Sequence, residues 1–116
     1  MVALARANNP DINIPMPAME FLRDSYGRTF EGQVDKWPWS TPVINSKVYG
    51  GVLSVDQRVD LYDTIVHESW HYDKQSFYSR GTLPSENEAR AQADARTARD
   101  EAKIRKSANS CGECSK

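Results

Sequence analysis

The two histidines of the chain both lie in the string His67-Glu68-Ser69-Trp70-His71, which has the pattern H-E-x-x-H. On a helix, residues i and i+4 lie on the same face one turn apart, so both imidazoles can reach one ion. Glu68 lies beside them, placed to hold a metal-bound water and to take its proton. The string therefore predicts a site for one Zn²⁺ ion, with Glu68 as general base. The alternative is an amphipathic helix with two surface histidines.

The third ligand of this site must come from elsewhere in the chain. A catalytic zinc usually has three protein ligands and leaves the fourth position for water. No further histidine exists and no cysteine follows closely, so a carboxylate remains. The segment Pro84-Ser85-Glu86-Asn87-Glu88-Ala89 offers Glu86 and Glu88. Ser85 and Glu88 also fit a capping box, in which Glu88 would bond back to the Ser85 amide instead of a metal.

These two motifs resemble those of the gluzincins, the thermolysin-like zinc metallopeptidases. In that family a Glu ligand follows H-E-x-x-H at the start of the next helix, often within the string Asn-Glu-Ala. Asn87-Glu88-Ala89 matches this string. The resemblance, which covers residues 48–98, implies Glu88 as the third ligand. Glu86 is the second choice, because related families place the ligand in E-x-x-A.

The resemblance also implies a function. In such a metallopeptidase, Glu68 takes a proton from a zinc-activated water that attacks a peptide bond, so the expected partner is a protein or peptide substrate. The small chain is similar in size to stand-alone zincins and to toxin or effector domains of larger secreted bacterial proteins, which would have a cognate immunity or inhibitor protein. Two alternatives stay open: a metal-binding interaction module without hydrolysis, and an amidase acting on peptidoglycan.

Composition bounds the remaining possibilities. With 116 residues, 39% hydrophobic and 27% charged, the chain fits one zincin-like domain over residues 1–110 and a polar tail over 111–116. The net charge of -1 gives no basic face for nucleic acid, and no apolar run is long enough to span a membrane. The start lacks the apolar region of a signal peptide, so secretion would need another route or a larger protein. The tail carries Cys111 and Cys114, a lone C-x-x-C that predicts a mobile end, a local disulfide or a shared metal site.

We expect an α+β fold: a minimal zincin-like core with a small antiparallel sheet, an active-site helix and a second helix carrying the third ligand. The first helix should run over residues 55–77, with Ser54 and Gln57 forming a capping box. Its core stripe would contain Val59, Tyr62, Val66, Trp70 and Phe77. The second helix should run over residues 86–107, capped by Ser85, with an alanine-rich first half that packs against the first helix.

The N-terminal part shows weaker signals. We expect irregular structure over residues 1–17, a short helix over 18–26, a strand within 28–34, a loop over 35–42 and strand structure over 43–54. By the resemblance, Tyr49-Gly50-Gly51-Val52-Leu53 is the edge strand that pairs with substrate; a plain turn is the alternative. A side chain that stabilises the transition state is expected among Tyr49, Tyr72, Tyr78 and Arg90. Trp37 and Trp39 are expected as core or loop anchors, with a cleft wall as the alternative.

Overall fold

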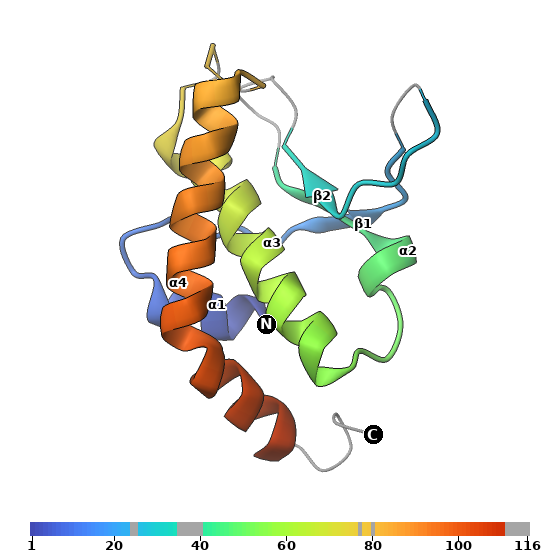
Figure 1. Cartoon of the computed structure of the whole chain (residues 1–116), viewed down its shortest axis with the longest axis vertical. Coiled ribbons are helices and arrows are strands. Elements are labelled where there is room, and N and C mark those ends of the chain that lie inside the picture. The colour runs from blue at the N-terminus through green and yellow to red at the C-terminus, as the bar shows by residue number, and fades with distance from the viewer. Residues whose placement is uncertain (24–25, 35–40, 77, 80, 111–116) are drawn as a thin grey trace.

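The computed structural model describes residues 1–23, 26–34, 41–76, 78–79 and 81–110 (Figure 1). Its elements are, in chain order, α1 (Val2–Asn8), β1 (Ala18–Glu20), β2 (Gly32–Gln33), β3 (Val43–Asn45), α2 (Ser46–Tyr49), α3 (Val55–Lys74) and α4 (Leu83–Ser110). Helices combine with one small sheet, so the predicted α+β class is confirmed. Most of the predicted 35–42 loop with both of its tryptophans, Phe77 and the 111–116 tail with both cysteines lie outside the described residues.

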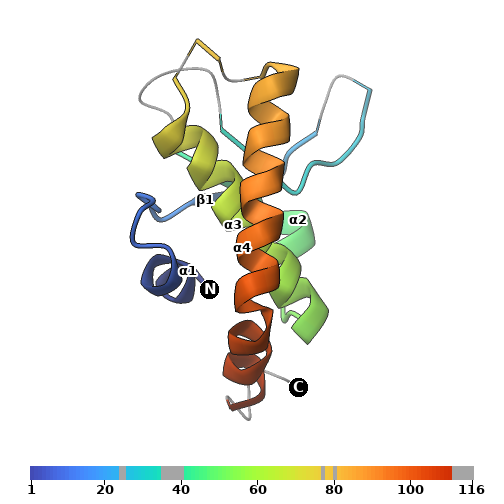
Figure 2. The same cartoon turned by 60° about the vertical axis from the view of Figure 1, so that its left-hand side comes forward.

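The two long helices, α3 and α4, lie side by side and run in opposite directions (Figures 1 and 2). α3 begins at the predicted capping box: Ser54 Oγ accepts from the Gln57 amide at 3.2 Å, and Gln57 Oε1 accepts from the Ser54 amide at 2.9 Å. The helix ends at Lys74, a little earlier than predicted, because Gln75 has extended backbone. The C-terminal end of α3 therefore lies beside the start of α4.

α4 begins three residues before the predicted start, and this changes the role of Ser85. Thr82 Oγ1 accepts from the Ser85 amide at 3.3 Å, so Thr82 caps the helix. Ser85 itself lies inside the first turn and is buried. The predicted Ser85 cap, and with it the capping box with Glu88, is wrong. Ala89 and Ala93 are fully buried, which fits the predicted close packing of α4 against α3.

The sheet has the strand order β1-β3-β2 and is mixed rather than antiparallel as predicted. β1 pairs with β3 in parallel, whereas β2 pairs with β3 antiparallel, so β1 and β2 are its edges. The predicted helix over residues 18–26 is wrong: Ala18–Glu20 is strand β1, and none of the other described residues of this segment is helical. Pro15 and Pro17 favour the extended backbone that leads into this strand. β2, at Gly32–Gln33, lies within the predicted 28–34 strand.

The predicted edge strand at residues 49–53 is not present either. The strand structure stops at Asn45, whose Oδ1 accepts from the Lys47 amide at 2.8 Å and so caps α2. Tyr49 is the last residue of that helix. The chain then reaches α3 without forming another strand. Of the described strands, β2 and β3 both pack against α3, and of these two only β2 lies at an edge of the sheet.

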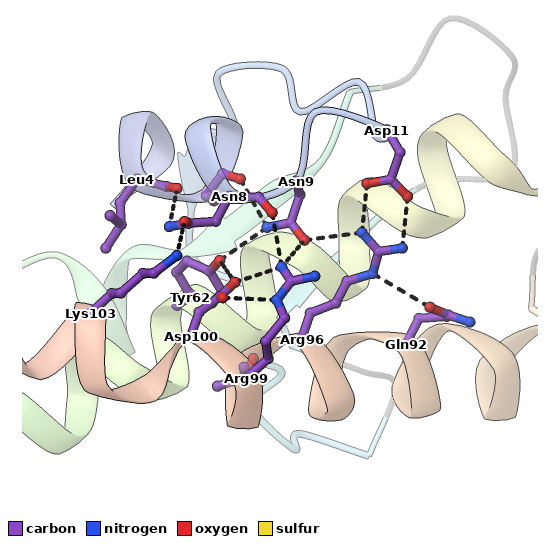
Figure 3. A network of polar contacts seen from close by, with 12 residues as sticks. Leu4, Asn8, Asn9, Asp11, Tyr62, Gln92, Arg96, Arg99, Asp100 and Lys103 are labelled. Carbon is purple, nitrogen blue, oxygen red and sulfur yellow. Dashed lines mark hydrogen bonds and ion pairs between the residues drawn. The ribbon is translucent and has the colours of Figure 1, made fainter.

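α1 was not predicted, and a buried polar network holds it against both long helices (Figure 3). Asn9 Nδ2 donates to Tyr62 Oη at 3.0 Å, and Tyr62 Oη donates to Asp100 Oδ2 at 2.5 Å. The guanidinium groups of Arg96 and Arg99 both donate to Asn9 Oδ1, at 3.0 and 3.1 Å. Asn9, Tyr62 and Asp100 are almost fully buried. The network thus connects the end of α1 to α3 and α4 at a single point.

The core lies where α1, α3, α4 and the sheet meet. Of the predicted α3 stripe, Tyr62 and Val66 are fully buried, and Val59 and Trp70 pack against the core from its margin. The buried cluster consists of Ala5, Ile12, Ile14, Ile44, Tyr49, Tyr62, Ile65, Val66, Ala93 and Ile104. Among the described residues, no helix combines the length and apolar character needed to cross a membrane.

Candidate metal centre

The two histidines of the motif lie on the C-terminal half of α3, and their side chains face the first turn of α4. His67 Nε2 and His71 Nε2 are 3.2 Å apart. Glu86 reaches both of them: its Oε1 lies 2.7 Å from His67 Nε2 and its Oε2 lies 3.0 Å from His71 Nε2. One ligand atom from each of the three residues falls within 4.8 Å of the others. This group could bind a metal ion.

Glu88 does not belong to this group. Its Oε1 accepts a hydrogen bond from Trp70 Nε1 at 2.7 Å. Successive residues of an α-helix are rotated by about 100°, so Glu88 points about 200° away from Glu86 around α4. The structure therefore brings the second choice, Glu86, to the histidines and leaves the first choice, Glu88, at another contact. The sequence signal for Glu86 was the pattern E-x-x-A.

Sequence reasoning missed the residues that orient His71. Gln75 Oε1 lies 2.5 Å from His71 Nδ1, and Ser85 Oγ donates to the same oxygen at 2.7 Å. Gln75 Nε2 donates to the Ser85 carbonyl at 2.7 Å, which fixes the orientation of the amide. An amide oxygen only accepts, so the hydrogen-bond network assigns the proton of His71 to Nδ1. The available signal was the spacing, because Gln75 is one helical turn beyond His71.

This tautomer makes the three groups a suitable set of metal ligands. With the proton on Nδ1, His71 Nε2 presents a lone pair to the carboxylate oxygen of Glu86, and two acceptors cannot hydrogen bond to each other. Either a second proton on Nε2 or a metal ion between the two groups resolves this conflict. Burial also lowers the pKa of His67, more than Glu86 raises it, and so favours the neutral imidazole that a metal requires. Two imidazole nitrogens and one carboxylate oxygen are ligands that Zn²⁺ accepts.

Glu68 lies next to the three candidate ligands but does not belong to that group. The residue is 7% exposed, and its carboxylate makes no hydrogen bond to any residue that the structure describes. Its contact with His67 Nε2, at 3.9 Å, is too long for one. Burial, and secondly the negative charge of Glu86, raise the pKa of Glu68 to about 8. A carboxyl group in this position can carry a proton at neutral pH, which suits an acid–base role.

Two cavities open at this centre, with volumes of about 360 and 470 Å³. Both are lined by Phe30, Gly32, Glu68 and Glu86, so they meet beside the candidate ligands. Gly32 allows β2 to lie this close to α3. A Cβ atom at Gly32 would lie 2.9 Å from Thr64 Cγ2 and 3.3 Å from Glu68 Cγ. The strand beside the centre is thus β2, not the predicted segment at residues 49–53.

The side chains expected to stabilise a transition state lie in different surroundings. Arg90 lines the smaller cavity, and its guanidinium is 3.8 Å from Glu86 Oε1. The hydroxyl of Tyr49 is buried in the core and pairs with Thr64 Oγ1 at 3.2 Å. Neither Tyr72 nor the highly exposed Tyr78 is among the described residues that line the two cavities. Of the four, only Arg90 borders the centre.

Comparisons of this chain with protein-family models, with curated proteins and with solved structures found no match. The function therefore has to be argued from the geometry of the centre itself.

Proposed function

We propose that the chain is a zinc-dependent peptidase in which His67, His71 and Glu86 hold the metal and Glu68 is the general base. One observation carries this proposal: three side chains with ligand chemistry converge within 4.8 Å, and a buried carboxylate without hydrogen bonds lies next to them. The sequence motif supports it independently, because H-E-x-x-H requires these roles at this spacing.

The chain's own residues supply the proton transfers of such a reaction. When bound, Zn²⁺ lowers the pKa of a water ligand and polarises the scissile carbonyl. Glu68 faces both cavities and is positioned to take the proton of the attacking water and to return it to the leaving amine. Arg90, at the border of the centre, is the candidate donor to the developing oxyanion.

The two connected cavities give a substrate a path across the centre. β2 is an edge strand that packs beside Glu68, so an extended peptide that paired with its outer side would pass over the metal. The edge strand that the family resemblance leads us to expect is then supplied by Gly32–Gln33.

Zinc content and turnover test this proposal together. Elemental analysis should find about one zinc per chain in the wild type and in Glu68→Gln, because Glu68 is not a ligand. A fluorogenic peptide library should be cleaved by the wild type, and Glu68→Gln should lose about 10²–10⁴-fold in rate. Glu101→Gln is the control, since Glu101 is an exposed residue far along α4 whose side chain faces Arg105.

Three results would contradict the proposal. A wild type that binds no zinc would show that His67, His71 and Glu86 do not form a zinc site. A Glu68→Gln variant as active as the wild type would show that Glu68 is not the general base. Zinc-loaded protein that cleaves no peptide would favour a metal-binding interaction module, and digestion of peptidoglycan but not of peptides would favour an amidase.

A further inference from the structure

Three side chains from three different elements form a continuous chain of hydrogen bonds beside β2. Tyr49 ends α2, Thr64 lies in the middle of α3, and Glu31 precedes β2. Tyr49 Oη and Thr64 Oγ1 are 3.2 Å apart, and Thr64 Oγ1 and Glu31 Oε2 are also 3.2 Å apart. Tyr49 and Thr64 are buried, whereas Glu31 is exposed. Two buried hydroxyls thus fix a side chain that would otherwise move freely in solvent.

The direction of the hydrogen bonds follows from the chemistry of the three groups. An ionised carboxylate only accepts, so Thr64 Oγ1 donates to Glu31 and itself accepts from Tyr49 Oη. Burial raises the pKa of Tyr49 more than the hydrogen bond with Thr64 lowers it, and the negative charge of Glu31 adds to the increase. The phenol therefore keeps its proton at neutral pH. We call the donors Tyr49 and Thr64 with their acceptor Glu31 the hydroxyl relay.

The hydroxyl relay holds the segment at the start of β2 against α3. Thr64 uses both branches of its side chain: Oγ1 bonds Glu31, and Cγ2 lies 2.9 Å from the position that a Cβ atom of Gly32 would take. Asn45 holds the same segment from β3, because its amide donates to the Glu31 carbonyl at 2.8 Å and its Nδ2 donates to the Phe30 carbonyl. The sheet thus fixes the backbone of this segment, and the relay fixes its position relative to α3.

Gly32 is the residue of β2 whose backbone faces away from the sheet. In an antiparallel pair, residues that hydrogen bond to the partner strand alternate with residues whose N–H and C=O point away from it. The Glu31 carbonyl bonds to β3, so the N–H and C=O of Gly32 point to the free side of this edge strand. Gly32 also lines both cavities. A peptide that paired with β2 would therefore bond to the backbone of Gly32.

We propose that Tyr49 and Thr64 are positioning residues for substrate binding. Acting through Glu31, they hold the backbone of Gly32 where an extended peptide can pair with β2 and cross the candidate metal centre. This inference rests on the proposed peptidase function. Without the relay, Asn45 would still pair β2 with β3, but the distance of β2 from α3 would vary. A peptide would then bind less tightly, because the strand would have to be ordered on binding.

Steady-state kinetics on one peptide that the wild type cleaves in the fluorogenic library tests the relay. Tyr49→Phe and Thr64→Val each remove one hydroxyl and nearly preserve the shape of the side chain. Both should raise KM about tenfold, as expected for one lost hydrogen bond in a chain that ends on a charged group. The value of kcat should change less than about twofold, because Glu68 and the candidate ligands stay in place. Thr64→Ser keeps the hydroxyl and should restore KM to within about threefold of the wild type.

A destabilised variant outside the cleft separates positioning from a general loss of stability. Asn9→Ala removes hydrogen bonds between α1 and the long helices, and Asn9 is not among the described residues that line the two cavities. Urea denaturation would rank the stabilities of all variants, and Asn9→Ala should keep the KM of the wild type. Unchanged KM in both Tyr49→Phe and Thr64→Val, or an equal rise in Asn9→Ala, would overturn the inference.

Peptide binding distinguishes failure of the relay from failure of the proposed function. The probe is acetyl-tetraalanine-amide, titrated into Glu68→Gln protein with zinc added and followed by the ¹⁵N resonance of Gly32. If the wild type cleaves no peptide, a shift of this resonance and a tenfold weaker affinity on adding Tyr49→Phe would keep the positioning role and remove the peptidase. Cleavage with unchanged KM in the hydroxyl variants would keep the peptidase and remove the positioning role. A wild type that neither cleaves peptides nor shows a shift at Gly32 would remove both.

Discussion

Gln75 Oε1 and His71 Nδ1 lie 2.5 Å apart, and this contact links the candidate metal centre to the junction of the two long helices. Gln75 follows the last turn of α3 and also bonds Ser85 in the first turn of α4, through both its oxygen and its nitrogen. The residue that orients one imidazole thus also holds the helix that carries Glu86. A metal site built from two helices depends on such a link, because either helix could otherwise slide along the other.

Replacing Gln75 by alanine should weaken zinc binding by about 10–100-fold, the range typical of outer-shell partners of a ligating histidine. Competition with a chromogenic chelator would measure the affinity, and ¹⁵N chemical shifts of His71 would show a mixture of tautomers in place of one. Gln92→Ala is a suitable control, since Gln92 accepts a hydrogen bond from Arg96 within α4 and does not contact the centre. Unchanged affinity with an unchanged tautomer would refute the positioning role of Gln75.

The two glutamates of α4 should respond differently to substitution. Glu86→Gln should reduce zinc affinity by about 100-fold or more, beyond the effect of an outer-shell partner, because it removes a charged ligand. Glu88→Gln should keep the zinc and cost about 1 kcal/mol of stability at most, since the Trp70–Glu88 hydrogen bond is exposed. Isothermal titration with Zn²⁺ compares the two variants directly. If Glu88→Gln lost zinc and Glu86→Gln kept it, Glu88 would be the third ligand, as the family resemblance implies.

Local signals predicted the part of the site that depends on one helix. The Ser54–Gln57 capping box and the spacing of His67 and His71 involve residues three or four apart, so nearby sequence determines them. The α+β class and the burial of Tyr62 and Val66 follow from residue periodicity in the same way.

Nearby sequence could not decide between Glu86 and Glu88 as the third candidate ligand, because the glutamate that reaches the histidines depends on where α4 begins. Thr82, and not Ser85, caps that helix, and Ser85 is buried and bonds to Gln75, the residue that follows α3. This contact joins two helices and leaves no local pattern in the sequence. α1 is a similar case: Asn9 meets Tyr62, a residue distant in the sequence. Tertiary contacts thus determine where α4 begins and stabilise α1, and both outcomes differ from what the local sequence favours.

Gly32→Ala should disturb both the sheet and the centre. The new methyl group would lie 2.9 Å from Thr64 Cγ2 and 3.0 Å from the Val43 carbonyl oxygen, so β2 or α3 must move. Overpacking of this kind typically costs about 1–3 kcal/mol. Urea denaturation should show this loss, and turnover should fall because Glu68 packs against the same position. Gly51→Ala is the control, as a Cβ atom there meets nothing within 4 Å. Equal stability of the two variants would contradict the predicted close approach.

Asn9→Ala should destabilise the whole fold. The substitution removes the donor to the buried Tyr62 and the acceptor shared by Arg96 and Arg99, and Asn9 itself is fully buried. Leaving buried polar groups without partners costs about 1–3 kcal/mol. Asn13→Ala, at an exposed position before β1, should change stability by less than about 0.5 kcal/mol. Chemical denaturation of both variants checks this, and similar midpoints would show that the network contributes little.

The stability of the metal-free protein should depend on pH through Asp63. Burial, and then the neighbouring Asp94 carboxyl, raise the pKa of Asp63 from 3.8 to about 7. The native state therefore favours the protonated form, and this contribution is fully present below about pH 4 and is lost as the pH rises through about 7. Asp63→Asn removes the titrating group, so the variant should gain on the order of 1 kcal/mol relative to the wild type at pH 8 but little at pH 4, after allowance for solvent screening. Urea denaturation in EDTA across this range measures the difference, with the exposed Glu20→Gln as control. A constant offset between Asp63→Asn and the wild type at all pH values would show that Asp63 titrates normally in the folded protein.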